Sequence, residues 1–488
     1  MSLDIVLLFA VLLIPTIGAL AVCLDSKRTP WAVATVSLGL TAVTSTLLAT
    51  LLILDGATVY RLGIQGGPGL VFRSDALSVT VGLLDVVLTL GILGYTRTAG
   101  PHGREFYVPY LLFTTAVFGV VLSGDLLGIY AFLVLLIWAT GRLVECSEKA
   151  GVEATARGYR RTATLGASVY LVGVLLAVWL GGSSDGQRLG FALAEVGYTD
   201  SLVVTSFVFM TVGLALLVAL VPLHGWLIET HARATDPVSA LISGVLPAAA
   251  VYAFFRVLFD VFTLEFLTAN PAVTNGIIYG AIGSLLVGNL LAYGQRDIKG
   301  MLAYSTISQF GLIVAGLLVA TETAVFGSVI QLFGHGIVKG AFCLVAGLIA
   351  IRFDARTIDE FGGLANRAPL VAAAFAGLAI AMIGLPPTVG FVGKWYIAVG
   401  ALEQGLWVVT AFVVFSTLLT LGYVIPFVDR IYFGTFDGVD NGPQSITATM
   451  VAVVVLAALL SLAIGLASVT FEAFLREAIE GLVAAPVE

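Results

Sequence analysis

Residues 324–351 read AVFGSVIQLFGHGIVKGAFCLVAGLIAI, an apolar run that is long enough to cross a lipid bilayer as a helix. Gln331, His335 and Lys339 lie inside this run at intervals of four residues, so a helix places them on one face. A lysine near the bilayer centre costs about 2.5–3.5 kcal/mol on insertion scales, and such residues are kept where they have a partner or a water path. The stretch therefore predicts a transmembrane helix whose polar stripe, Gln331–His335–Lys339, has a function.

The composition extends this prediction to the whole chain. Of the 488 residues, 59% are hydrophobic and 11% are charged, whereas soluble domains carry about 25% charged residues. We therefore expect an all-α polytopic membrane protein, with the net charge of −7 in its loops and no nucleic-acid partner. Cys23, Cys146 and Cys343 lack metal-ligand spacing, and the sequence has no nucleotide or haem motif, so we expect neither a metal nor a cofactor.

Apolar windows of about 20 residues predict about fourteen transmembrane spans. They cover residues 3–24, 31–54, 77–96, 106–123, 126–144, 162–181, 202–221, 238–260, 276–294, 301–320, 324–351, 369–400, 406–428 and 446–470. Most of the 23 lysines and arginines fall in alternate loops, and placing those loops inside puts both termini outside. Among the outer loops, residues 55–76 have two β-like runs around GGPG and predict a hairpin, and residues 182–200 predict a short amphipathic helix.

Prolines interrupt two of the predicted spans, at Pro222 in the seventh and at Pro386 and Pro387 in the twelfth. A proline inside a span frees carbonyl groups that only protein or water can satisfy. The breaks are five spans apart, which suggests two inverted five-helix repeats, helices 4–8 and 9–13, with ion sites at the breaks. We expect N-terminal helices 1–3 with the hairpin (1–105), a first repeat (106–260), a second repeat (276–428) and a C-terminal helix with a tail (429–488).

Four motifs in order resemble the antiporter-like subunits shared by Mrp-type cation/proton antiporters, respiratory complex I and membrane-bound hydrogenases. They are PLHGWLIETHARATDPVSALISG (222–244), QRDIKGMLAYSTISQFG (295–311), HGIVKGAFCLVAGLI (335–349) and GLPPTVGFVGKW (384–395). The stretch LGYVIPFVDRIYFG (421–434) looks more like the branch that contains the D-type subunit of Mrp antiporters and the hydrogenases. The resemblance covers about residues 70–435 and implies fourteen helices with inverted five-helix repeats.

The resemblance also implies a polar axis through the membrane, and the chain matches only part of it. The second-repeat charges are present as His335, Lys339 and Lys394. The three first-repeat positions, which hold a glutamate and two lysines in the family, are Leu133, Leu217 and Ala248 here. Without these charges the first repeat has no ion pair to switch, so the resemblance implies a proton half-path through the second repeat.

Other polar residues are candidates for relay or support. Possible relay or supporting groups are Gln331, Ser305, Thr306, Ser308, His224 and Asp85. His231 also flanks the first break, where a structural role and a relay role both stay open. Arg256 and Asp260 are expected to pair at i, i+4, and Lys299 is expected to anchor its helix at the membrane interface.

The leading hypothesis is a non-enzymatic subunit of a multisubunit sodium/proton antiporter in the cell (plasma) membrane. It would move protons, work with paralogous antiporter-like subunits and other membrane subunits, and contact the lipid bilayer. The alternatives are a proton-pumping subunit of a complex-I-like NADH-quinone oxidoreductase or hydrogenase, a degenerate structural subunit that conducts nothing, and a partner of an inorganic-carbon uptake protein.

Overall fold

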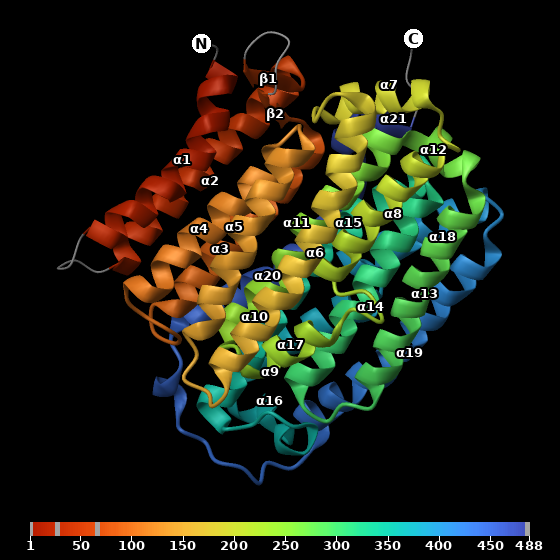
Figure 1. The fold of residues 1–488 in the computed structure, drawn as a ribbon. Coiled ribbons are helices and arrows are strands. Elements are labelled where there is room, and N and C mark those ends of the chain that lie inside the picture. Colours follow the sequence, from red (N-terminus) through yellow and green to blue (C-terminus); the bar gives the residue numbers. More distant parts are fainter. Residues whose placement is uncertain (1–2, 25–29, 64–68, 484–488) are drawn as a thin grey trace.

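The computed structural model describes residues 3–24, 30–63 and 69–483, and these residues form a bundle of long helices (Figure 1). The first half contains α1 (Leu3–Leu24), α2 (Pro30–Asp55), α3 (Ala76–Thr96), α4 (Arg104–Leu122), α5 (Leu126–Glu145), α6 (Val152–Gly181), α7 (Gly186–Val196), α8 (Ser201–Leu217), α9 (Gly225–Arg233), α10 (Asp236–Gly244), α11 (Leu246–Arg256), a π-helix (Val257–Phe262) and α12 (Thr263–Ala269). The polytopic all-α fold predicted from composition is confirmed.

The second half continues with helices of similar length. It contains α13 (Pro271–Tyr293), α14 (Ile298–Val319), α15 (Glu322–Phe353), α16 (Leu364–Arg367), α17 (Pro369–Ile383), α18 (Val389–Glu403), α19 (Trp407–Phe433), α20 (Ala448–Leu466) and α21 (Ser468–Val483), with 3₁₀ turns at Ile358–Phe361 and Pro443–Ser445. Among the described residues, 12 helical segments are long and apolar enough to cross a membrane. The shorter apolar helices α8 and α17 end at the predicted breaks. The count of fourteen spans and the five-helix repeats stay predictions.

Both proline breaks are present. The first break, residues 218–224, separates α8 from α9 and contains a cis Val221–Pro222 bond. The second break, residues 384–388, separates α17 from α18 and contains a cis Pro386–Pro387 bond. The sequence did not predict a further interruption at Val245 between α10 and α11, where Pro247 occupies the first turn of α11, the place in a helix that best tolerates proline.

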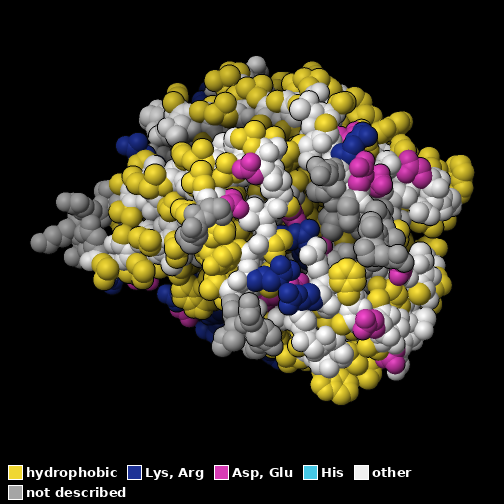
Figure 2. Space-filling view, turned by 90° about the horizontal axis from the view of Figure 1, so that it is seen from above, with side chains coloured by type: hydrophobic (Ala, Val, Ile, Leu, Met, Phe, Trp, Pro, Cys, Tyr) yellow, Lys and Arg dark blue, Asp and Glu magenta, His cyan; other side chains and the backbone are white. Residues whose placement is uncertain are grey.

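One end of the bundle carries the hairpin, α7 and α21, and we call it the hairpin end; α16 lies at the opposite end, the α16 end (Figure 1). Strands β1 (Thr58–Gly63) and β2 (Gly69–Ser74) pair antiparallel, with Thr58 opposite Ser74. The predicted hairpin and the short helix α7 are both confirmed, while residues 64–68, which hold most of GGPG, lie outside the described residues. Figure 2 shows the hairpin end, where Lys and Arg side chains gather near the middle of a largely hydrophobic face.

The helix quoted first, α15, lies at the centre of the bundle. In its most apolar stretch of 18 residues, 89% of the residues are buried. The corresponding shares are 94% for α14 and 100% for the segment from α10 to α12. In contrast, only 33% and 22% of the residues in the most apolar stretches of α19 and α20 are buried. The exposed leucines and valines of these two helices form an apolar surface suited to lipid. The polar stripe therefore lies inside protein rather than against lipid.

Candidate functional site

Lys339 lies near the middle of α15, and its side chain is buried with 1% exposure. Its Nζ contacts the Ser305 hydroxyl of α14 and lies 3.4 Å from the Leu302 carbonyl oxygen. An ammonium group removed from water needs such acceptors to offset its lost hydration. The predicted relay residue Ser305 is therefore in direct contact with the predicted proton-path lysine.

The other two stripe residues lie on the same face of α15, one and two turns nearer the hairpin end. The His335 ring is edge-on to Phe310, with 4.8 Å between ring centroids, and it is 5% exposed. Gln331 donates a hydrogen bond of 2.8 Å to the side-chain oxygen of Gln309 on α14. Sequence reasoning missed Gln309, although its place one turn beyond Ser305 on the same helix would have indicated it.

A small cavity joins the polar stripe to the second break. Its lining consists of Gln309, Gln331, Gly334, His335, Val338, Lys339, Ala381, Met382 and Gly390. Three buried polar atoms of these residues have no hydrogen-bond partner in the structure: Gln309 Nε2, Gln331 Oε1 and His335 Nε2. Buried polar atoms are satisfied by protein or by ordered water, so a cavity lined by such atoms suits bound water.

Lys394 lies on α18 just past the second break, with 4% exposure. Its Nζ donates to the Ile383 carbonyl at 2.8 Å and lies 3.5 Å from the Met382 carbonyl. These carbonyls belong to the last turn of α17, where the break leaves them without helical N–H partners. Gly384 begins the break with φ of +84°, a left-handed conformation that glycine adopts without strain. The carbonyl groups at the broken end of α17 thus form the binding site of the Lys394 ammonium group.

The residues at the three predicted first-repeat positions, Leu133, Leu217 and Ala248, are apolar and buried. Leu133 and Leu217 line one cavity, together with Leu136, Ile137, Tyr159, Trp226, Leu246 and Ala250. Ala248 is fully buried but does not line this cavity. The Trp226 indole donates a 2.9 Å hydrogen bond to the Leu216 carbonyl, so a neutral donor serves the broken end of α8. At the first break a tryptophan therefore binds a freed carbonyl, whereas at the second break Lys394 does so.

The structure does not bring every predicted residue to this site. His224 is half-buried at the start of α9, with Nδ1 unpartnered. Asp85 is fully buried on α3 with both oxygens unpartnered, and Ser308 Oγ is unpartnered as well. Of the predicted relay and supporting residues, Gln331 and Ser305 therefore join the site by direct contacts.

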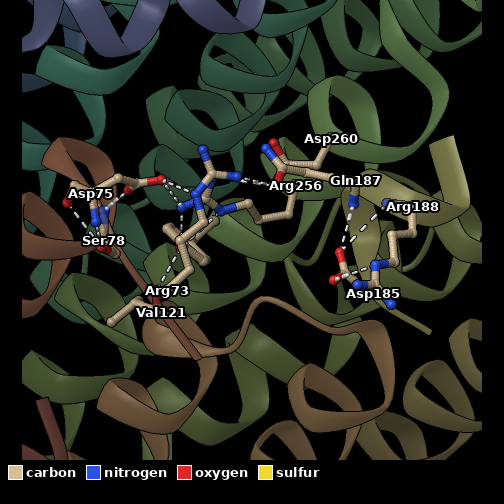
Figure 3. Close-up of polar contacts among 10 residues, drawn as sticks. Arg73, Asp75, Ser78, Val121, Asp185, Gln187, Arg188, Arg256 and Asp260 are labelled. Carbon is tan, nitrogen blue, oxygen red and sulfur yellow. Dashed lines mark hydrogen bonds and ion pairs between the residues drawn. The ribbon is translucent and has the colours of Figure 1, made fainter. Parts of the chain in front are cut away.

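A second polar cluster lies at the hairpin end (Figure 3). The predicted pair of Arg256 and Asp260 is confirmed at 3.2 Å, and Arg256 also binds Asp75 at 2.5 Å. Arg73 of β2 contacts both acids, at 2.9 Å to Asp75 and 3.2 Å to Asp260. Burial by itself raises the pKa of Asp75, but Arg256 and then Arg73 lower it to about 2. This balanced cluster joins the hairpin to the end of α11.

Lys299 differs from expectation. The sequence favoured an interfacial anchor, but the Lys299 side chain is 4% exposed and forms a 2.9 Å ion pair with Asp236. Packing of α14 against the start of α10 buries it, which spacing along the sequence does not reveal. No group of three or more metal-ligating side chains occurs among residues 3–24, 30–63 and 69–483.

Comparison with known proteins identifies the class. The profile of the family described as NADH:quinone oxidoreductase/Mrp antiporter, TM, matches residues 123–420, and the chain belongs to this family. It is therefore an antiporter-like membrane subunit of the Mrp or complex I type, as the motifs indicated.

Two relatives with curated names are subunits of NADH-quinone oxidoreductases. The chain is 34% identical over 361 residues to NADH-quinone oxidoreductase subunit N of Desulforudis audaxviator, covering 72% of this chain and 71% of that protein. It is 26% identical over 427 residues to NADH-quinone oxidoreductase subunit M of Rhodobacter capsulatus, covering 81% and 80%.

Solved structures share the fold over nearly the whole chain. A chain of the Mrp complex from a Dietzia species matches with a TM-score of 0.89 at 23% identity, covering 99% of this chain and 98% of that one. A chain of respiratory complex I from Thermus thermophilus with bound NADH matches with a TM-score of 0.85 at 22% identity, covering 98% and 100%. At these identities the likeness establishes the fold alone.

Proposed function

We propose that this chain is a proton-translocating subunit of a multisubunit monovalent cation (sodium)/proton antiporter in the plasma membrane, and that its second repeat carries the proton half-path. The observation that carries the proposal is the line of buried titratable groups Lys339, His335 and Lys394 beside a polar cavity. Lysine and histidine side chains exchange protons when burial and neighbouring groups bring their two protonation states close in free energy.

The apolar first repeat supports a division of labour within the complex. Leu133 and Leu217 offer no proton acceptor in their shared cavity. A paralogous antiporter-like subunit would supply the other half of the ion path. The subunit itself carries out no covalent chemistry.

A second candidate is a proton-pumping subunit of an NADH-quinone oxidoreductase, and the names of the curated relatives favour it. The parent complex decides between the two. Purification of the complex through a tag on this chain, followed by identification of its partners, distinguishes redox subunits from antiporter subunits. Sodium-dependent proton movement without NADH supports the first candidate, whereas NADH-driven proton movement supports the second.

The proton half-path is tested in everted vesicles that contain the whole parent complex. Lys339→Ala and Lys394→Ala are compared with wild type and with Arg476→Ala, an exposed arginine on α21 that serves as the control. We expect both lysine variants to abolish proton transport while the complex stays assembled, and the control to transport normally. Normal transport by both lysine variants would make the chain a structural subunit and refute the proposal.

A further inference from the structure

We propose that protons reach Lys339 from the α16 end of the molecule through a polar route formed by Asp236, His231, Ser243 and Thr306. The inference rests on the proposed function and adds to it a point of access and the residues that deliver the proton. The route passes between α10, α14 and α15 and avoids the apolar first-repeat cavity.

The route begins at Asp236, the first residue of α10. Asp236 binds two cations of different exposure: Arg356, with a side chain 39% exposed, at 3.5 Å, and Lys299, 4% exposed, at 2.9 Å. Lys299 also donates to the Ala234 carbonyl at 2.8 Å, which fixes its position. Asp236, at 13% exposure, therefore connects the solvated surface to the buried interior.

His231 is the next group, fully buried in the last turn of α9. Its Nε2 lies 2.5 Å from Ser243 Oγ, whereas its Nδ1 has no hydrogen-bond partner in the structure. His231 precedes Asp236 by five residues, across the short connection from α9 (Gly225–Arg233) to α10 (Asp236–Gly244). An imidazole with one bonded and one free nitrogen can accept a proton at the free nitrogen and release one from the other.

Ser243 carries the route to the polar stripe. Its Oγ lies 3.5 Å from Thr306 Oγ1 on α14, and its backbone lies beside His335. Thr306 and Ser305 both donate to the Leu302 carbonyl, at 2.8 and 3.0 Å, and Ser305 contacts Lys339. The helices are close here, since a Cβ on Gly244 would lie 2.9 Å from the Gly336 carbonyl oxygen. Hydroxyl groups both donate and accept, so Ser243 and Thr306 can each take one proton and pass on another.

The transfer conserves protons at every step. A proton binds His231 Nδ1, and the Nε2 proton moves to Ser243 Oγ, whose own hydroxyl proton moves toward Thr306, Ser305 and the Lys339 amine. Only N–H and O–H bonds form and break. The ring regains its starting state when Nδ1 and Nε2 exchange roles, and no co-reactant other than water is needed.

The route is tested by proton transport in everted vesicles that hold the whole complex, with assembly checked for each variant. We expect His231→Ala and Ser243→Ala to lower the rate at least about tenfold. Ser206→Ala is the matched control, because Ser206 is equally buried and its hydroxyl donates to the Val203 carbonyl of its own helix, α8, at 2.8 Å; it should transport at the wild-type rate. Added imidazole should restore transport to His231→Ala and leave Ser243→Ala slow, a result that a purely structural role for the histidine does not produce.

Asp236→Asn tests access to the route, and Asp440→Asn is its control. Asp440 also bridges two arginines, Arg352 at 3.2 Å and Arg367 at 3.9 Å, but it does not contact a route residue. We expect slowed transport for Asp236→Asn alone.

The outcomes separate the two proposals. Full transport by the His231 and Ser243 variants, together with loss in Lys339→Ala, would refute the route and leave the proposed function standing. Full transport by Lys339→Ala and Lys394→Ala would refute both. If His231→Ala does not assemble, His231→Gln decides in its place, since glutamine can bond Ser243 but cannot exchange protons; wild-type transport by that variant would refute the route.

Discussion

At the scale of single residues, the buried basic side chains Arg256, Lys339 and Lys394 have partners of two kinds. Arg256 is 3% exposed and is held by Asp75, Asp260 and the Tyr252 hydroxyl. Lys339 and Lys394, by comparison, have neutral oxygen partners. The arginine is thus held in its charged form by carboxylates. The two lysines have no carboxylate partner among the described residues, as the proposed proton path requires.

Removing Arg256 should destabilise the fold strongly. Arg256→Ala removes the more deeply buried of the two arginines that Asp75 and Asp260 share, and we expect a loss of about 3–5 kcal/mol in the free energy of unfolding. Arg61→Ala is the control, because its ion pair with Asp185 at 3.0 Å involves a side chain that is 45% exposed and contributes about 0–1 kcal/mol. Thermal unfolding in detergent measures both; equal effects would contradict the assignment.

The same cluster predicts a pH dependence. The pKa of Asp75 is about 2 in the fold, below the value of about 3.9 in an unfolded chain. A depressed carboxyl pKa stabilises the fold above the unfolded value, and the contribution is lost as the pH falls from about 4 toward 2. We expect the stability difference between wild type and Asp75→Asn to shrink by about 2 kcal/mol over that range. A constant difference in melting experiments would count against it.

At the scale of helices, the two breaks differ in the side chain that binds the freed carbonyl groups. Both breaks expose the last carbonyls of a half-helix; Trp226 serves one end and Lys394 the other. The backbone arrangement is alike at the two breaks. The side chain that binds the carbonyls, Trp226 or Lys394, determines whether a titratable group is present there.

Gly384 should be required for the binding of Lys394 to the carbonyl groups at the end of α17. A Cβ there would lie 3.0 Å from Lys394 Cδ, and the φ of +84° costs a non-glycine residue about 1–2 kcal/mol. We therefore expect Gly384→Ala to lower both the melting temperature and the transport rate. Gly276→Ala on α13, where a Cβ meets open space, should change neither appreciably. Unchanged transport by Gly384→Ala would show that transport does not depend on the exact position of the Lys394 side chain.

Sequence patterns predicted most of the elements but fewer of their contacts. Hydrophobic length and proline positions predicted the spans and both breaks, because lipid and proline constrain the chain locally. The i, i+4 rule found Arg256 with Asp260, whereas Asp75 is 181 residues away and only packing joins them. Gln309, Lys299 and the bond from His231 to Ser243 were missed for the same reason. A polar residue inside an apolar helix shows that it needs a partner without showing which one.

At the scale of the whole molecule, the two halves differ in what their centres can hold. Leu133 and Leu217 line one cavity, whereas Lys339 and His335 line another. Placing charges at Leu217 and Leu133 tests whether the leucine-lined cavity can hold an ion pair.

Leu217→Lys alone should cost about 3–5 kcal/mol, because it buries an uncompensated charge. Adding Leu133→Glu across the same cavity should recover part of this, with a coupling energy of about 1–3 kcal/mol. Leu143→Glu is the control partner, since Leu143 is also buried on α5 but does not line the cavity. A double-mutant cycle on unfolding measures the coupling; equal coupling to both partners would mean that the cavity is not preformed for the pair.

The leucine-lined cavity also has an electrical consequence. A membrane voltage of 100 mV does about 2.3 kcal/mol of work on each elementary charge that crosses the whole field. Leu133 and Leu217 carry no charge for that field to move, so the cavity that they line acts as an insulator. On the proposed function, the voltage would do work on protons along the route that leads to Lys339 and the line of Lys339, His335 and Lys394, so a single subunit would couple to the field through one path instead of two.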